Sequence, residues 1–304
     1  MILDCQQNRI ELVTRHGCLQ STSACIPVEY YQLLPFFCQF IGTETDEEVS
    51  QACLKALCFL SVCYVPKDTI PQVLDMVWKV SQSTSWKAKL SILEFLQVFV
   101  FTNFMSMCMQ PAVVSRCEDI VVSMLGDDNA NVQSKAAKVL CGMIHSRFLE
   151  HQTLLLSKFR GKIYQVSNKE AIAVDPGAGN GSSPPVAKKR KKGHLKGQTQ
   201  AKQKALFEKL SADKKAMSDY HSGILGLCSL VEAYPHDVPS FMPDVLMELE
   251  KHLHDPQPIP KTIKKTLQEF KRTHQDNWAE HKLKFTEDQL LVMTDLLVSP
   301  NYYA

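Results

Sequence analysis

Residues 111–144 decide the fold, and they read PAVVSRCEDIVVSMLGDDNANVQSKAAKVLCGMI. Apolar residues recur at helical spacing on both sides of the polar turn Gly126–Asn129, which predicts one helix over 111–125 and a second over 131–144. An acidic or amide residue before the second helix suits the N-cap position, and the small pair Ala136 and Ala137 allows close packing. This stretch therefore predicts a helix pair of the HEAT type.

The same order of helix, polar turn and helix returns on both sides of this stretch. Aligning the second helices puts Val49, Trp86 and Val132 at one position, and the intervals of about 37 and 46 residues are typical of HEAT or armadillo repeats. The fold class predicted is all-α, a HEAT/armadillo-like helical-repeat solenoid, and the alternative is a generic helical bundle. The other predicted helices begin at Tyr30 and span 47–64, 70–80, 86–104, 239–253 and 263–270.

One basic insertion interrupts the array. Lys158 to Lys215 carries fifteen Lys or Arg against four Asp or Glu, so it contributes +11 to a net charge of +2 and leaves −9 for the remainder. Because residues 174–202 are rich in Gly, Pro, Ser and Lys, we expect a disordered loop. The helices near 151–166 and 216–234 are expected to form one pair across it. The predicted domains are 1–166 (HEAT-like repeats), 167–202 (the disordered basic loop), 203–298 (a C-terminal HEAT-like domain) and 299–304 (a tail).

A compact basic run lies inside this loop, directly after two prolines. Such a run matches a monopartite nuclear localisation signal, with importin as the partner and with nucleus and cytoplasm as the localisation. There are two alternatives. The run is only a solvated linker, or it makes a weak contact, either with nucleic acid without sequence specificity or with a histone tail. The run consists of Lys188, Lys189, Arg190, Lys191 and Lys192.

The sequence offers no signature of an enzyme. Walker, GxGxxG, GxSxG and HExxH patterns are absent, and His252 and His254 are expected on different sides of a helix. We therefore expect no catalysis, no cofactor and no metal. The apolar run from Leu90 to Met109 is interrupted by Glu94 and Gln97, which favours a buried helix over a membrane span. With no signal peptide at Met1 and no CxxC pair, a reducing cytosolic or nuclear compartment is expected.

The last five residues, Pro300 to Ala304, form a distinct tail. They follow an apolar helical stretch, 288–298, which Pro300 cannot continue. Tyrosine offers a large contact area and a polar tip, and a terminal carboxylate is an anion that a lysine can bind. The tail therefore suits insertion into a pocket, and a frayed terminus is the alternative.

Four stretches resemble the giant HEAT-repeat proteasome activator family. The resemblance implies that the chain is the C-terminal end of a longer protein, as a fragment or a short isoform. It also implies that Tyr302, Tyr303 and Ala304 insert between α subunits of the proteasome core particle and favour gate opening without ATP. The Ala304 carboxylate would pair with a pocket lysine and Tyr303 would fill the pocket. The stretches are residues 234–243, 254–259, 270–278 and 285–304.

The family is also described as having a bromodomain-like region that binds acetyl-lysine, with links to acetylated-histone degradation, DNA repair and spermatogenesis. By resemblance this region spans residues 111–199, and its Asn-Phe pair falls at Arg147 and Phe148. Arginine therefore stands where the family's asparagine would bond the acetyl carbonyl.

The function predicted is an ATP-independent activator of the proteasome core particle, through its α ring. The alternatives are a chromatin adaptor that binds acetylated histones, a truncated regulator with no gate-opening activity, and a transport-receptor-like scaffold. No membrane and no sequence-specific nucleic acid are expected as partners.

Overall fold

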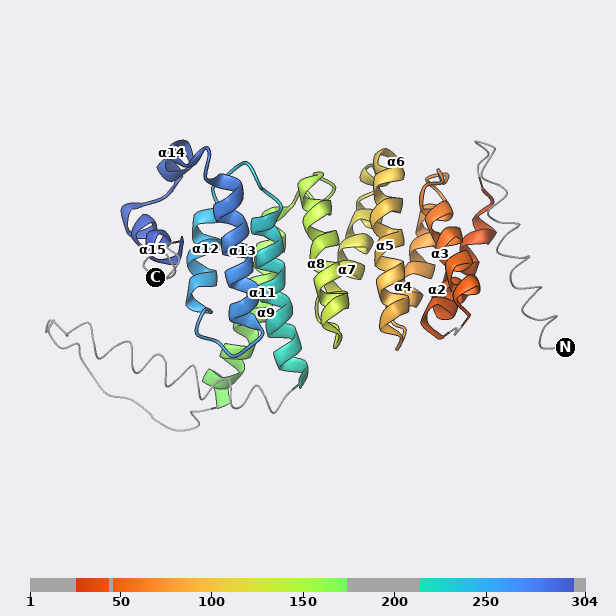
Figure 1. Cartoon of the computed structure of the whole chain (residues 1–304), viewed down its shortest axis with the longest axis horizontal. Coiled ribbons are helices and arrows are strands. Elements are labelled where there is room, and N and C mark those ends of the chain that lie inside the picture. The colour runs from red at the N-terminus through yellow and green to blue at the C-terminus, as the bar shows by residue number, and fades with distance from the viewer. Residues whose placement is uncertain (1–25, 44–45, 174–213, 298–304) are drawn as a thin grey trace, which may run out of the picture. The chain divides into compact units, whose positions relative to one another are not determined.

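The computed structural model describes residues 26–43, 46–173 and 214–297. These residues form helices joined by turns, and no strand occurs among them, so the fold is all-α and built from helical repeats (Figure 1). The chain divides into two compact units, residues 1–150 and 151–304. The domain boundaries predicted at residues 166 and 202 stay predictions.

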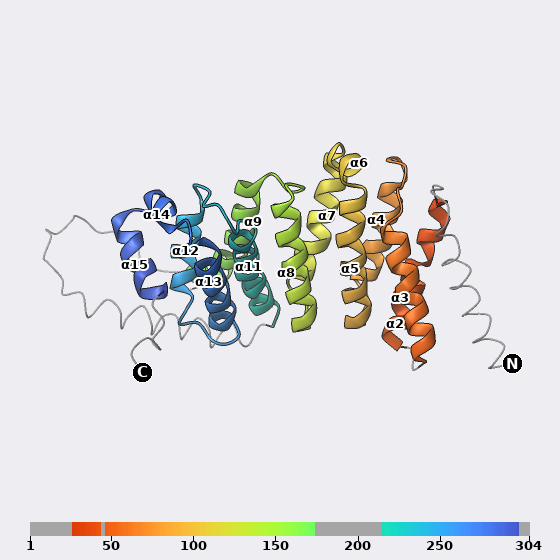
Figure 2. The same cartoon turned by 45° about the horizontal axis from the view of Figure 1, so that its top comes forward.

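The first unit is a stack of three helix pairs in two layers. The first helices of the pairs, α2, α4 and α7, pack on one another in order, and so do the second helices, α3, α5 and α8 (Figures 1 and 2). This two-layer stack is the arrangement expected of HEAT-like repeats. Its elements are η2 (Val28–Leu33), α2 (Leu34–Thr43), α3 (Glu47–Ser61), α4 (Ile70–Ser81), α5 (Trp86–Thr102), α6 (Phe104–Cys108), α7 (Pro111–Met124) and α8 (Ala130–His145).

Each second helix begins with a side-chain cap. The side chains of Asp46, Ser85 and Asn129 accept hydrogen bonds from backbone N–H groups of the first turns of α3, α5 and α8. Such caps satisfy donors that a helix start leaves without an intrahelical partner. The acidic or amide cap predicted before residue 131 is therefore confirmed at Asn129. The Lys89 ammonium lies 2.6 Å from the Asp127 carboxylate and ties this turn to α5.

The helix predicted over 86–104 ends earlier, at Thr102. The side chain of Asn103 donates to the carbonyls of Phe99 at 3.2 Å and Cys63 at 3.1 Å, and it accepts from the N–H of Val65 at 2.9 Å. Asparagine competes in this way with the regular helix ladder. The break separates α5 from the short α6, so it also divides the apolar run that begins at Leu90. Among the helices that the structure describes, none is both long and apolar enough to cross a membrane.

The second unit is built on the helix pair α9 and α11, which pack closely although residues 174–213 separate them in sequence. α11 also contacts α12 and α13, and α15 packs on α12 and α13. The expected pairing across the basic insertion is thus observed between the described helices. The elements are α9 (Gln152–Ala173), α11 (Lys214–Glu232), α12 (Met242–Lys251), α13 (Ile259–His274), α14 (Trp278–His281), η3 (Lys282–Lys284) and α15 (Glu287–Leu297).

Two glycines allow α9 and α11 to approach each other. A Cβ at Gly226 would lie 2.3 Å from the ring of Phe159, and one at Gly223 would lie 2.7 Å from the Ile163 side chain. Phe159 and Ile163 are fully buried in this contact. The helix expected to start at Pro239 begins instead at Met242, with Pro243 in its first turn, where a missing N–H costs no hydrogen bond.

Candidate functional site

Helix α15 holds the part of the chain that precedes the tail. The Thr286 hydroxyl accepts from the N–H of Gln289 at 3.3 Å, and the Gln289 side chain accepts from the N–H of Thr286 at 3.0 Å, which makes a capping box. The amide nitrogen of Gln289 also donates to Asp244 of α12 at 3.2 Å. Met293 is fully buried. α15 is therefore held on the second unit through Gln289 and Met293.

An aromatic cluster lies beside α15, where α13 ends. The ring of His274 stacks on Phe270 with centroids 4.1 Å apart and meets His281 edge-on at 5.2 Å. Trp278 meets Phe270 at 90° and contacts Phe285, with centroids 5.6 Å apart. The cluster thus brings together residues of α13, of α14 and of the segment that precedes α15.

Polar contacts pin this cluster to the turn before α12. The two ring nitrogens of His274 lie 2.9 Å from the Phe270 carbonyl and 3.1 Å from the Asp237 carbonyl. The Asp237 carboxylate also accepts from Lys284 at 2.8 Å, and this hydrogen bond lowers its pKa. The pKa of His281 is lowered by burial first, and then by the nearby His274 and Lys284, so its imidazole is neutral at pH 7.

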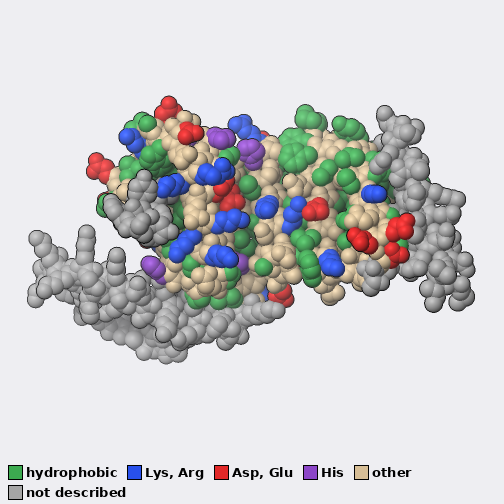
Figure 3. Space-filling view, in the orientation of Figure 1, with side chains coloured by type: hydrophobic (Ala, Val, Ile, Leu, Met, Phe, Trp, Pro, Cys, Tyr) green, Lys and Arg blue, Asp and Glu red, His purple; other side chains and the backbone are tan. Residues whose placement is uncertain are grey.

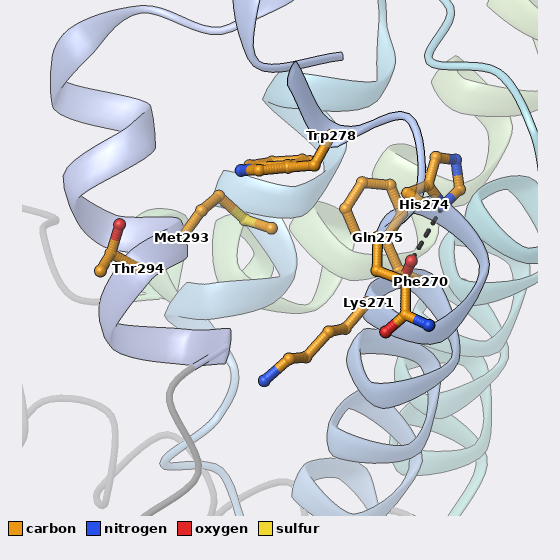
Figure 4. A pocket seen from close by; sticks show the side chains of 7 residues that line it. All are labelled: Phe270, Lys271, His274, Gln275, Trp278, Met293 and Thr294. Atoms are coloured by element: carbon orange, nitrogen blue, oxygen red, sulfur yellow. Dashed lines mark hydrogen bonds between the residues drawn. The ribbon is translucent and has the colours of Figure 1, made fainter. Parts of the chain in front are cut away.

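A cavity of about 290 Å³ opens between α13, α14 and α15 (Figure 4). Buried side chains of Phe270, His274 and Met293 form its floor, and the half-buried Trp278 forms one wall. Exposed side chains form its rim: Lys271, Gln275 and Thr294. The cavity is thus apolar inside, with one cation and two hydrogen-bonding groups at the edge.

Arg147 and Phe148 directly follow helix α8 and close its C-terminal end. Arg147 has a φ of 60°, and its N–H donates to the Ile144 carbonyl, while the N–H of Phe148 donates to the Met143 carbonyl at 2.9 Å. This pair of bonds with a left-handed residue is a Schellman motif. The Phe148 side chain is 2% exposed and its ring centroid lies 5.9 Å from that of Phe104. Both residues thus have a local role in packing and capping.

Two of the predicted sites lie outside the described residues. These are the tail residues Tyr302, Tyr303 and Ala304, and the basic run from Lys188 to Lys192. Within the described ranges, no group of three or more His, Cys, Asp or Glu side chains could hold a metal ion. His252 contacts Asp255 and Tyr220 instead, with its Nδ1 at 3.0 Å and 2.8 Å from their oxygens.

Sequence reasoning missed the cavity. In the sequence, Phe270 belongs to a predicted helix, residues 270–278 resemble a family, and Met293 is part of an apolar helical stretch, but none of these features predicts a cavity. The missing information is tertiary, because α13 and α15 contribute residues that are about twenty positions apart. No spacing rule relates Lys271 to Thr294.

Comparison with known proteins finds relatives whose sequences align with residues of both units. Residues 217–304 match the sequence family described as proteasome activator complex subunit 4-like, C-terminal. Proteasome activator complex subunit 4A of Danio rerio is 36% identical over 296 residues, which is 96% of this chain and 14% of that protein. Proteasome activator complex subunit 4 of Homo sapiens is 35% identical over 279 residues, 91% of this chain and 14% of that protein.

A plant relative, proteasome activator subunit 4 of Arabidopsis thaliana, is 24% identical over 239 residues, 79% of this chain and 11% of that protein. An engineered protein of known structure aligns over 87% of this chain and 90% of its own at 14% identity, but its TM-score of 0.31 is too low for the likeness to bear on fold or function.

The described residues form a helical-repeat protein, and residues 217–304 match a family described as proteasome activator-like. The chain belongs to the proteasome activator complex subunit 4 family and resembles its C-terminal part. It spans about 14% of the length of the first relatives it matches.

Proposed function

We propose that this chain binds the α ring of the proteasome core particle through Tyr302, Tyr303 and Ala304 and biases the gate towards its open state. The observation that carries the proposal is the family match, which runs through residues 217–304 and so includes most of α11, the helices that follow it in the second unit, and the tail. The activator names of the relatives support the same function.

The geometry of α15 supports a tail that inserts into a pocket. Its capping box, its contact to Asp244 and the burial of Met293 fix the helix on the unit, so the tail starts from a rigid base. A rigid base lowers the entropy lost when the tail binds. The Ala304 carboxylate would pair with a lysine of the partner, and Tyr303 would fill the pocket between two α subunits.

The experiment is peptide hydrolysis by purified core particle, measured without ATP, with the 304-residue chain and with a chain lacking residues 302–304. We expect stimulation by the first and none by the second. Tyr303→Ala should weaken binding about thirtyfold, because a buried aromatic anchor commonly contributes about 2 kcal/mol. Tyr64→Ala, which changes an exposed tyrosine of the first unit, is the matched control. Equal stimulation by every variant would rule out the tail mechanism.

On this proposal the chain is a regulator rather than an enzyme, and it needs no cofactor. Its action is a shift in the population of open gates, so the free energy comes from differential binding to the two gate states. Omitting nucleotide should therefore leave the stimulation unchanged.

A role in acetylated-histone degradation and DNA repair extends the proposal into the nucleus. The basic run from Lys188 to Lys192 supports import through importin. An acetyl-lysine site at Arg147 and Phe148 would require the Phe148 side chain, which is 2% exposed, to become accessible to the ligand. A titration with acetylated and unmodified histone peptides tests the site, and equal affinity for both would exclude it. Replacing the five basic residues by alanine should shift the protein from nucleus to cytoplasm.

A further inference from the structure

The cavity in the second unit lies next to the end of α15. Thr294 is on its rim and Met293 is on its floor, and α15 ends three residues later, at Leu297. Three residues of helix advance the chain by about 4.5 Å. The cavity is therefore about one helical turn from the point where the tail begins.

The size and lining of the cavity favour an aromatic side chain with an anionic group next to it. About 290 Å³ is at the small end of ligand sites, which suits a single aromatic side chain rather than a cofactor. The rings of Phe270 and Trp278 and the thioether of Met293 line the cavity, and such groups favour contact with an aromatic ring. At the rim, Gln275 can form hydrogen bonds with a phenol, and the Thr294 hydroxyl, which donates to the Leu290 carbonyl at 2.8 Å, can accept one. In Figure 4 the Lys271 side chain extends along the cavity towards the α15 side, where its ammonium can attract an anion.

We propose that this cavity binds the chain's own C-terminal tail, with the ring of Tyr303 inside and the Ala304 carboxylate beside Lys271. The tail carries the ring and the anion that the lining selects, on adjacent residues. Six residues from 298 to 303 span at most about 20 Å when extended, so a tail that turns back can reach one helical turn.

The bound tail is withheld from other partners. If the tail is free in a fraction f of molecules, the apparent dissociation constant for any partner of the tail rises by 1/f. This regulatory consequence rests on the proposed function, whereas the binding of the tail to the cavity does not. The cavity would thus set how readily the tail engages the core particle.

The first test is direct binding of a tail peptide. A fluorescently labelled peptide with the sequence of residues 298–304 is titrated into a chain that lacks residues 302–304, and anisotropy is measured. We expect the peptide with a free carboxylate to bind several-fold more tightly than its C-terminal amide. Lys271→Met should weaken binding of the free acid by about tenfold or less, as for an ion pair at a solvated rim. Lys261→Met, an exposed lysine near the start of α13, is the matched control and should not change it.

A second variant tests the apolar part of the cavity. Thr294→Trp places a large side chain at the rim on the solvent-exposed face of α15, so it should block the peptide while the thermal midpoint stays unchanged. No binding of the peptide, or equal binding by free acid and amide and by Lys271→Met, would overturn the proposal.

Carboxypeptidase digestion of the intact chain tests whether the cavity is occupied by the chain's own tail or by the tail of a second copy. Carboxypeptidase should release Ala304 and Tyr303 more slowly from the intact chain than from Lys271→Met, and the rates should not depend on protein concentration. Protection that increases with concentration would assign the cavity to the tail of a second copy and overturn binding within one chain. None of these measurements uses the core particle, so a failure to stimulate the core particle would leave them unaffected.

Discussion

Nε of Arg160 lies 2.6 Å from Oε2 of Glu248, and this ion pair joins α9 to α12. The Glu248 side chain is 5% exposed, and its other oxygen, Oε1, is buried without a hydrogen-bond partner. Because Arg160 is 36% exposed, water screens part of the attraction. The ion pair therefore stabilises the second unit chiefly because it neutralises the buried carboxylate of Glu248.

Arg160→Ala is expected to lower the free energy of unfolding of the second unit by about 2 kcal/mol, because it leaves a buried carboxylate without its cation. The double variant Arg160→Met with Glu248→Met should recover most of this loss. Urea denaturation followed by Trp278 fluorescence, in a background without Trp78 and Trp86, reports on this unit alone. Arg272→Ala removes an exposed pair with Glu269 and is the control. If the double variant is no more stable than the single one, the burial argument is wrong.

Gly226→Ala is expected to destabilise the second unit by about 1–3 kcal/mol, because the added Cβ would lie 2.3 Å from the Phe159 ring. Gly161→Ala, on α9, has no atom within 4 Å of its Cβ and should instead stabilise the unit by about 0.5–1 kcal/mol. Opposite shifts of the two thermal midpoints are the expected result. Shifts of the same sign would contradict the close approach of α9 and α11.

Tyr220→Phe tests a buried network in which the Tyr220 hydroxyl donates to Asp255 at 2.6 Å and lies 2.8 Å from Nδ1 of His252. Losing this hydrogen bond to a buried carboxylate should cost about 1–3 kcal/mol at pH 7. The pKa of Tyr220 is raised by burial first, and then by the hydrogen bond to Asp255 and its charge. The folded chain therefore binds this proton more tightly than the unfolded chain does.

The protonated Tyr220 phenol therefore stabilises the folded chain fully at pH values below about 10, the pKa of tyrosine in the unfolded chain. This stabilisation is lost progressively as the pH rises above that value. We expect the difference in unfolding free energy between wild type and Tyr220→Phe to narrow above about pH 10. Urea denaturation at a series of pH values from 7 to 11 measures it. A difference that stays constant over this range would exclude the linkage.

Arg147→Gly is expected to stabilise the first unit by about 0.5–1 kcal/mol, since Arg147 has a left-handed φ of 60° that glycine adopts without strain. Arg147→Val should destabilise it, because a β-branched residue is unfavourable there. Circular dichroism during thermal unfolding measures both. A loss of stability in the glycine variant would show that the Arg147 side chain stabilises the first unit by more free energy than its left-handed backbone costs.

Local sequence signals predicted the repeat fold well. The polar turns before Val49, Trp86 and Val132 carry their own caps, so each helix start depends only on nearby residues. The end of α5 was not predictable in the same way. Asn103 breaks the helix because it reaches Cys63 and Val65, which are about forty residues away in sequence.

The candidate site was predictable only in part. The tail stands out in the sequence because Pro300 follows an apolar helix. The cavity beside α15 does not, because Phe270 and Met293 meet only after the unit has folded. The pairing of α9 with α11 followed from their position on either side of the insertion, whereas the need for Gly226 follows only from where the Phe159 ring lies.

The pairing of α9 with α11 also determines the order in which the chain can fold during translation. Each pair of the first unit is complete once neighbouring residues have left the ribosome. Leu155, Phe159 and Ile163 of α9 must instead wait for α11, about sixty residues later, and at about 5–20 residues per second the delay is roughly 3–12 s. During that interval these three apolar side chains of α9 lack their partner helix, and a chaperone can bind them.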